Sequence, residues 1–413
     1  IIKNKLFFFV NAEYSFDTVP GSKSKARPST TDKWGEDETY NRPTVAQMDE
    51  MKQFVADKYN YNPGRYQGYD LSTPDYKVLA RIDWNINKYN KFNIRFSNTH
   101  TSYSNPPSSS MSPIGGTNSV FTMPNGTQYK WNRYSAGRQS DYTMPFESAR
   151  YGQDQSFMSL AAELNTRFRS GKGTNTARVA WSHQYEPRSY TGGYFPTIDI
   201  MSTEDVNVTG TDNTAAYTSI GPDPFTFGNL RDVQTIIATD EVTFNVGKHN
   251  LLAGLQYEWN RTKNGYMQGG AGWFIYDSID TFKKDVTNPD ESSLPMAFMI
   301  THANVDDPTQ QVFPAFDYAQ YSAYVQDEIS FSDNFKMTAG IRFEVPQITI
   351  PTDNNNKAFA AIASNPDNAG TSFAGLSTAD VPQPRLTVSP RIGFNWDVAG
   401  NRKFIIRGGT GMY

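Results

Sequence analysis

The sequence predicts an all-β fold: a transmembrane antiparallel β-barrel in which short periplasmic turns alternate with long extracellular loops. The first supporting observation is the alternation of residues 335–345, whose apolar face consists of Phe335, Met337, Ala339, Ile341, Phe343 and Val345. The opposite face consists of Lys336, Thr338, Gly340, Arg342 and Glu344. Successive side chains of a strand point to opposite faces, so this strand is apolar on one side and polar on the other, as a barrel wall requires.

The second observation is a regular succession of short and long connections. Tight turns are predicted near residues 89, 171, 248, 333 and 400, and long polar segments separate the hairpins that these turns close. A soluble sandwich or propeller also repeats hairpins, but it has no reason to place every long loop at the same end. Long structureless loops are also rare in compact soluble domains. The asymmetry therefore favours the outer-membrane barrel.

The third observation is a composition rich in aromatic residues but without long apolar runs. Of the 413 residues, 37% are hydrophobic and 14% are aromatic, with 24 Tyr and 27 Phe. A membrane helix needs about 18 consecutive apolar residues, which the chain lacks, whereas barrels use aromatic residues as interfacial girdles. The net charge of −4 provides no basic field, so we expect no nucleic-acid partner. The absence of Cys excludes disulfides, thiolate catalysis and Cys-based zinc sites.

Taken in order, the chain begins with an aromatic strand over residues 5–14, followed by a polar segment to about residue 74. A short helix over 44–58, lying on that loop, is predicted because Thr44 and Gln47 match a capping box and apolar residues recur at helical spacing at Val45, Met48, Met51 and Val55.

The later strands alternate in the same way and form hairpins. They are predicted at about residues 76–86, 92–97, 158–168, 177–181, 236–246, 251–259, 321–331, 335–345, 392–398 and 404–413. With the first strand this makes eleven, whereas bacterial single-chain barrels have an even number. Both ends of the chain look cut, so we expect residues 1–413 to be the N-terminal part of a barrel domain, about half of a 22-strand barrel. The lumen of such a barrel needs a plug.

Two acidic residues do not fit the alternation. Asp240 and Asp327 fall on the apolar side of their strands, where a carboxylate facing lipid is unfavourable. A β-bulge between Val325 and Ile329 would turn Asp327 inward.

Several short motifs lie along the chain: residues 3–9 (KNKLFFF), 257–260 (YEWN), 324–328 (YVQDE), 339–343 (AGIRF), 389–394 (SPRIGF) and 407–411 (RGGTG). These motifs resemble the TonB-dependent outer-membrane receptors, and within them the Oar-like group of Bacteroidota. The runs YVQDE and AGIRF are typical of TonB-dependent barrels in general, and SPRIGF and RGGTG of the Oar-like group. The resemblance extends over essentially the whole chain.

The resemblance implies a protein of the bacterial outer membrane that is not an enzyme and needs no cofactor. It implies a transporter or receptor that moves a bulky ligand, of the peptide, protein or glycan class, with energy transmitted by TonB. The implied partners are outer-membrane lipid, the protein's own plug domain, TonB through the region before residue 1, and a surface lipoprotein or secretion-complex partner. Two alternatives stay open: a structural or interaction barrel that serves a surface or secretion complex, and a passive porin-like channel.

Two sets of residues are candidates for functional contacts. The lumen or plug-facing set is Arg81, Asp83, Arg95, Glu163, Arg167, Arg178, Glu258, Lys336, Arg342, Glu344, Arg391 and Arg407, and Glu241 and Asp397 share its parity. Its mixed charges suit a wall that pairs with itself and with a plug, or a substrate pathway. The ligand-binding set, on the loops, is Trp131, Tyr134, Tyr142, Tyr190, Tyr194, Tyr266, Trp273 and Tyr276. Tyr and Trp suit ligand capture, but they also pack loops against one another and build girdles.

The sequence contains no catalytic constellation. Its His residues, His100, His183, His249 and His302, show no paired spacing, and His249 falls in a predicted tight turn. The acidic and amide-rich runs 304–307 and 353–356 carry oxygen ligands suited to calcium, but without EF-hand spacing, so no metal site is predicted.

Overall fold

The computed structural model describes residues 2–22, 25–35, 39–109, 118–122, 126, 128–132, 137–139, 143–202, 215–303, 305–307, 309–350 and 356–412. Within these ranges, no helix is long and apolar enough to cross a membrane.

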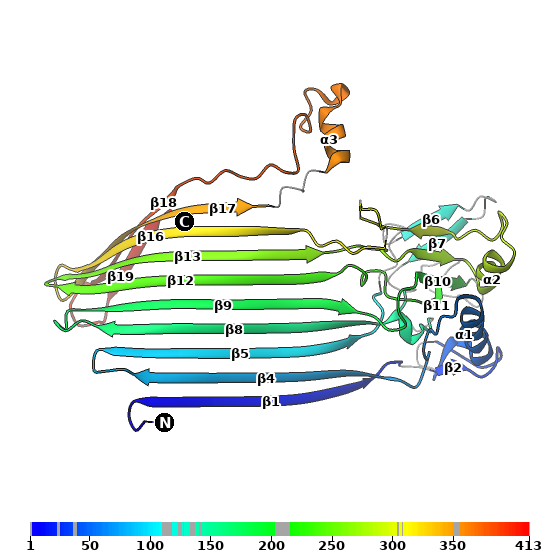
Figure 1. The fold of residues 1–413 in the computed structure, drawn as a ribbon, viewed down its shortest axis with the longest axis horizontal. Coiled ribbons are helices and arrows are strands. Elements are labelled where there is room, and N and C mark those ends of the chain that lie inside the picture. The colour runs from blue at the N-terminus through cyan, green and yellow to red at the C-terminus, as the bar shows by residue number, and fades with distance from the viewer. Residues whose placement is uncertain are drawn as a thin grey trace.

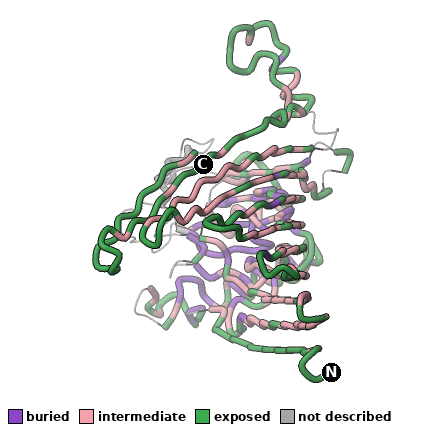
Figure 2. The backbone as a smooth tube through the Cα atoms, turned by 90° about the vertical axis from the view of Figure 1, so that its left-hand side faces the viewer, coloured by how far each residue is buried: buried purple, intermediate pink, exposed green. Residues whose placement is uncertain are grey.

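One antiparallel sheet of eleven strands dominates the molecule, and its spatial order follows the chain (Figure 1). Its strands are β1 (Leu6–Pro20), β4 (Asp70–Asn85), β5 (Asn90–Asn105), β8 (Tyr151–Arg167), β9 (Gly173–Ser189), β12 (Leu230–Val246), β13 (His249–Gly265), β16 (Ala315–Ser330), β17 (Phe335–Thr349), β18 (Thr387–Asp397) and β19 (Ile405–Gly411). The predicted all-β fold and its eleven-stranded antiparallel sheet are confirmed. Seen along the strands, the sheet is an open arc in which β1 and β19 form the two edges (Figure 2).

The short and long connections lie at opposite ends of the sheet. In Figure 1 the tight turns that join β4 to β5, β8 to β9, β12 to β13, β16 to β17 and β18 to β19 lie together at the left. The long connections lead to the right-hand end, where the smaller elements gather. The predicted separation of turns and loops is therefore present.

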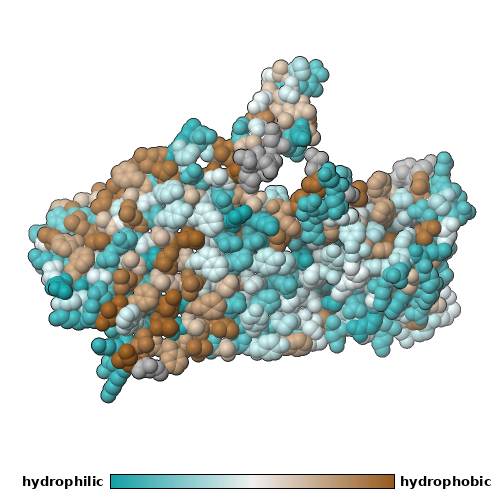
Figure 3. All heavy atoms as spheres, in the orientation of Figure 1, coloured by the Kyte–Doolittle hydropathy of each residue, from teal (hydrophilic) through white to brown (hydrophobic). Residues whose placement is uncertain are grey.

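The strands are longer than the sequence pattern predicts. β1 continues to Pro20 instead of ending near Tyr14, and β13 has 17 residues. An apolar band about 25 Å tall needs only about 10 tilted residues. The side of β13 that carries Leu251 and Trp259 becomes charged at Arg261 and Lys263, so its last residues extend beyond the apolar band. Hydrophobic side chains accordingly gather over the half of the sheet nearer the turns (Figure 3).

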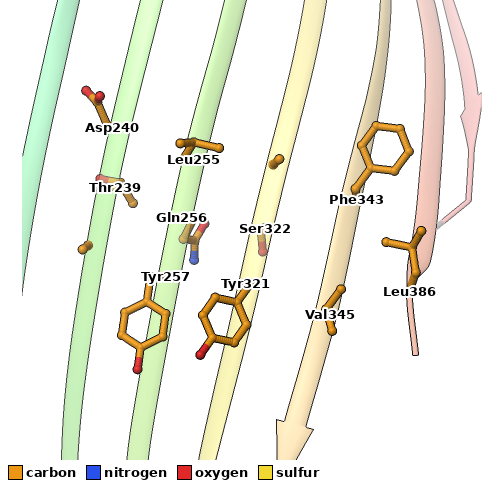
Figure 4. Close-up of a pocket in the computed structure, with 12 residues that line it drawn as sticks. Thr239, Asp240, Leu255, Gln256, Tyr257, Tyr321, Ser322, Phe343, Val345 and Leu386 are labelled. Atoms are coloured by element: carbon orange, nitrogen blue, oxygen red, sulfur yellow. The ribbon is translucent and has the colours of Figure 1, made fainter. Parts of the chain in front are cut away.

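The strand register is continuous across the sheet, so alternate residues of each strand point to the same face along its whole length. Aromatic residues on the apolar face form two rows. Near the turns Trp84 opposes Phe92 and Phe335 opposes Trp396. Farther along, Tyr14 opposes Tyr76, and the Tyr257 and Tyr321 rings lie 5.2 Å apart (Figure 4). Two such rows are the girdles expected where a barrel wall meets the membrane interfaces.

β16 has no bulge at Asp327. β16 pairs with both neighbours without a shift, and Asp327 opposes Leu251 and Ala339 on the apolar face. It lies near the turn end of β16, where its Oδ2 is 2.6 Å from His249 Nδ1. His249 is the first residue of β13, and its contact with Asp327 makes it more than a solvated turn residue. The carboxylate therefore has a polar partner on the neighbouring strand while β16 keeps a regular register.

Asp240 also lies on the apolar face, but farther from the turns. It opposes Ala177 and Leu255, and it accepts a hydrogen bond from the Asn175 side chain. The register of β12 is regular there, so Asp240 lies on the apolar face, as its position in the alternation predicts. The side chain has Asn175 as a polar partner on that face.

The described parts of connections 21–69, 106–150, 190–229 and 266–314 fold together, and we call this assembly the loop body. Its helices are α1 (Val45–Tyr59), α2 (Ile279–Thr287) and the 3-10 turn η1 (Glu147–Ala149). Its strands are β2 (Lys25–Arg27), β3 (Tyr40–Thr44), β6 (Asn118–Thr122), β7 (Gln128–Asn132), β10 (Thr197–Ser202), β11 (Ala215–Ile220), β14 (Trp273–Tyr276) and β15 (Ala297–Met299). Figure 2 shows buried residues concentrated in this assembly.

The predicted helix is confirmed as α1. Thr44 caps it through the Gln47 backbone N–H, Gln47 returns a bond to the cap backbone, and Asn60 ends it in the left-handed conformation. The predicted apolar stripe is the part that anchors the helix, because Met48, Met51 and Val55 are fully buried against residues of β10, β11, β14 and α2.

The fifth long connection differs from the other four. It carries α3 (Lys357–Ser364) and the 3-10 turn η2 (Pro366–Asn368), and it stands away from the loop body (Figure 1). Three of its larger apolar side chains, Ile362, Phe373 and Leu376, are exposed.

Candidate ligand-binding surfaces

The residues predicted to face the lumen all lie on one side of the sheet. Arg81 opposes Arg95, Glu163 opposes Arg178, and Ser322 opposes Glu344, and directly opposed residues of an antiparallel pair share a face. Through the continuous register this face carries Arg81, Asp83, Arg95, Glu163, Arg167, Arg178, Glu241, Glu258, Lys336, Arg342, Glu344, Arg391, Asp397 and Arg407. We call it the polar wall; a plug resting on it stays a prediction.

Neighbouring side chains neutralise much of the charge on the polar wall. The Arg81 guanidinium donates to both Asp83 carboxylate oxygens, at 2.8 and 2.6 Å. Arg342 Nε lies 2.7 Å from Glu344 Oε1, and Lys336 Nζ lies 2.9 Å from Glu328 Oε1. Arg342 and Glu344, like Arg81 and Asp83, are two residues apart on one strand and project from the same face, whereas Lys336 and Glu328 lie on neighbouring strands.

Hydrogen bonds also connect strands across the polar wall. Tyr324 donates through its hydroxyl to Glu241 Oε1 at 2.5 Å, and Gln320 Nε2 donates to Glu344 Oε1 at 2.8 Å. Arg342 Nη2 donates to Gln256 Oε1 at 3.2 Å. Side chains of β12, β13, β16 and β17 thus fix one another, which gives a rigid surface able to bind water or a polypeptide backbone.

Three of the aromatic residues predicted to bind ligand lie at the surface of the loop body. Tyr194 and Tyr266 are exposed, and Tyr190 is half-buried. Tyr194 packs edge-on against Phe227, and Tyr266 stacks on Phe225. Burial raises the pKa of the Tyr190 and Tyr266 hydroxyls above the ordinary value. Both hydroxyls therefore stay protonated at neutral pH and can donate hydrogen bonds to a ligand.

Two other predicted ligand contacts, Trp273 and Tyr276, lie inside the loop body. The Trp273 side chain is fully buried and donates through Nε1 to Asp199 Oδ2 at 2.7 Å. Tyr276 is buried as well, packs against Phe282, and donates its hydroxyl to Asp285 Oδ2 at 2.7 Å. Each ring fills a core and its polar atom is used inside the protein, so a ligand outside the loop body cannot reach either side chain.

The remaining predicted contacts cannot be placed in the same way. Tyr134 and Tyr142 lie outside the described residues. Trp131 lies in β7, opposite Ser119, and its side chain is outside the described part of the structure.

A buried ion-pair network in the loop body was not predicted from the sequence. Arg138 Nε lies 3.0 Å from Asp199 Oδ1, Arg138 Nη1 lies 3.1 Å from Asp223 Oδ2, and all three side chains are fully buried. Its guanidinium also lies over the Trp273 ring, 5.2 Å from the centroid. The network joins connections 106–150, 190–229 and 266–314. Because its members are far apart in the chain, no local sequence motif predicts it.

The described residues provide no group of three or more His, Cys, Asp or Glu side chains that could hold a metal ion. Among the acidic runs, Asn304 and residues 353–355 lie outside the described residues. Asp307 bonds to the Thr309 backbone N–H and hydroxyl, and these bonds hold its carboxyl pKa below the ordinary value. This carboxylate therefore stabilises a local turn.

Comparison with known proteins identifies one family. The family described as "Outer membrane beta barrel domain" matches residues 1–413. No curated protein sequence gives a significant match.

Solved structures with similar chain traces are distant in sequence. The outer membrane transporter YddB from Escherichia coli has a TM-score of 0.43 at 11% identity, over 83% of this chain and 32% of that one. The ferric-catecholate import receptor Fiu from E. coli K12 has a TM-score of 0.43 at 13% identity, over 85% and 48%. The FrpB iron transporter from Neisseria meningitidis has a TM-score of 0.41 at 8% identity, over 97% and 41%. The chain spans less than half the length of each of these structures.

Proposed function

We propose, from the premise that this chain belongs to the outer membrane beta-barrel domain family, that it forms part of a TonB-dependent transporter or receptor. It resides in the bacterial outer membrane. Its task would be to move a bulky ligand of the peptide, protein or glycan class across that membrane, with energy transmitted by TonB. The finer assignment to the Oar-like group rests on the sequence runs at 389–394 and 407–411.

The loop body is the observation that carries this proposal. A passive channel needs an open mouth, whereas here the described parts of four long connections pack around shared cores. Met48 of α1, Ile200 of β10 and Phe282 of α2 belong to one of these cores, although they come from three connections. A folded extracellular assembly with exposed Tyr194 and Tyr266 suits selective capture of a large ligand.

The polar wall supports the second half of the proposal. Eleven strands make an open arc without closing, which fits a wide barrel such as the predicted 22-strand one. A lumen of that width passes solutes freely unless a domain fills it. The hydrogen-bonded wall offers a surface on which a plug can rest and from which it can be displaced.

The test is uptake by cells that express the full-length protein, compared with a deletion strain, with and without an uncoupler of the proton-motive force. Labelled peptides and oligosaccharides of graded size are the probes. The proposal predicts accumulation that depends on the protein and is abolished by the uncoupler. Entry that ignores the uncoupler would instead establish the porin-like alternative. No accumulation, together with stable co-purification of a surface or secretion protein, would establish the structural alternative.

A further inference from the structure

The polar wall contains a hollow in which positive charge is incompletely neutralised. The hollow has a volume of about 330 Å³ and is lined by Arg81, Asn93, Arg95, Ala161, Glu163, Arg178 and Ala180. These residues come from the adjacent strands β4, β5, β8 and β9, so the hollow is away from both edges of the sheet. Its volume corresponds to about ten water molecules, enough for a small anion with part of its hydration shell.

Two of the three guanidinium groups are paired. Arg178 Nε donates to Glu163 Oε2 at 2.8 Å, and Asn165 Nδ2 holds the other Glu163 oxygen at 2.7 Å. Arg81 is held by Asp83 in a two-point contact. Both groups are therefore fixed in place and largely neutralised.

Arg95 is the exception. Within the described part of the chain, no carboxylate lies within ion-pair distance of its guanidinium, and the side chain is exposed on the polar wall. Three arginines face two carboxylates, Asp83 and Glu163, which leaves one net positive charge at the hollow.

The strand register makes this charge costly. Arg95 lies directly opposite Arg81, and like charges in directly opposed positions destabilise a sheet. On its other side Arg95 opposes Ala161, which in turn opposes Ala180. These two small side chains form a low floor beside Arg95, so an unpaired cation and free space occur together.

We propose that this hollow, which we call the Arg95 hollow, is an anion-binding site for a carboxylate or phosphate group. A guanidinium binds either group through two parallel hydrogen bonds, and Arg95 supplies the net positive charge because Arg81 and Arg178 are already paired. The anion has two possible sources: an acidic side chain of a protein segment that fills the lumen, or an acidic solute in transit. The inference rests on the proposed function only in taking the polar wall as the lining of a lumen.

The experiment measures thermal unfolding of the purified full-length protein in detergent, in phosphate or succinate against chloride at equal ionic strength. Wild type is compared with Arg95→Gln and Arg95→Lys. The matched control is Lys91→Gln, since Lys91 lies on the same strand and face but outside the hollow. If solute anions use the site, phosphate or succinate raises the wild-type midpoint, Arg95→Gln abolishes the rise, Arg95→Lys reduces it and Lys91→Gln keeps it.

If a protein carboxylate already occupies the site, the added anions have no effect on wild type. Arg95→Gln then lowers the midpoint more at low salt than at high salt, Arg95→Glu lowers it further, and Lys91→Gln does neither. The proposal is overturned if Arg95→Gln and Lys91→Gln behave alike in both comparisons. Since no step measures uptake, a failure here is distinguishable from a failure of the proposed transport function.

Discussion

Single residues of the loop body show how the same residue type serves two purposes. Tyr and Trp on long loops suit both ligand capture and loop packing, and the sequence pattern does not separate the two. Burial separates them: Trp273 and Tyr276 lie inside, whereas Tyr194 and Tyr266 lie outside. The deciding factor is the partner of each ring's polar atom, and the partners Asp199 and Asp285 become evident only once the connections are folded.

Substitutions at these aromatic positions should therefore differ in their effect on stability. Trp273→Phe keeps most of the packing but leaves Asp199 without one donor, so we expect a loss of about 1–3 kcal/mol in the unfolding free energy of the loop body. Tyr266→Ala, at an exposed site, should change it by about 0.5 kcal/mol or less. Denaturant unfolding followed by near-UV circular dichroism measures both. Equal losses would contradict the assignment of Trp273 to the core.

Arg138 should be the most sensitive position of the loop body. Arg138→Met preserves much of the side-chain volume but leaves Asp199 and Asp223 buried without their cation. Removing one partner of a buried ion pair typically costs about 3–5 kcal/mol. Limited proteolysis of the full-length variant should cut the loop body faster than in wild type while the barrel strands stay protected. Unchanged proteolysis would show that the network is not needed.

At the scale of secondary-structure elements, alternation predicted the strands, their faces and the tight turns. It did not predict their full length, because alternation fades where a strand leaves the lipid while its hydrogen-bonded ladder continues. β13 illustrates this: Leu251 to Trp259 follow the apolar pattern, but Arg261 and Lys263 extend the same face into water. The polar partner of Asp327 could not be predicted from its own strand either, since His249 lies on a neighbouring strand.

Two residues of β17 provide a matched test of the two faces. Ile341 lies on the apolar face, opposite Val325 and Pro390, whereas Thr338 lies on the polar wall opposite Glu328. Ile341→Arg should destabilise the barrel by about 2–4 kcal/mol, the cost of a cation facing the bilayer midplane. In Thr338→Arg the new side chain contacts water and lies opposite the Glu328 carboxylate, so the substitution should destabilise the barrel much less. Unfolding of the full-length protein in lipid vesicles compares them, and equal costs would argue against a two-sided wall.

At the scale of the whole molecule, the sequence predicted an outer-membrane barrel but not the loop body. Each long connection reads as polar and irregular by itself. Only α1 had a recognisable pattern, because its capping box and apolar stripe are local. The cores join residues from separate connections, as Phe146, Ile220 and Phe282 do, and their pairing is a tertiary property. The polar wall could be predicted from the alternation of apolar and polar residues along each strand, whereas the buried Arg138 network could not be predicted from the sequence.

The loop body should lose stability in alkaline solution. Burial and the hydrogen bond to Asp49 raise the pKa of Tyr66 to about 12, above the ordinary value of about 10. Since the folded state holds this proton more tightly, its contribution is complete below about pH 10 and is lost as pH rises from about 10 to 12. Burial also raises the pKa of Tyr276. A titration of near-UV circular dichroism should show a loss of loop-body signal in this interval, and Tyr66→Phe should make it shallower. A flat profile up to about pH 12 would contradict the expectation.

The central claim, that the sheet is a membrane wall with one face toward lipid and one toward a water-filled lumen, has a direct test. Residues 1–413 contain no Cys, so a single Cys substitution at any position from 335 to 345 introduces one spin-labelling site into this part of the full-length protein in vesicles. Collision rates with oxygen and with a water-soluble paramagnetic complex report lipid and water contact. The structure predicts a period of two: oxygen-accessible at Phe335, Met337, Ala339, Ile341 and Phe343, and water-accessible or shielded from both at the positions between them. Equal access to water at every position would contradict the membrane wall.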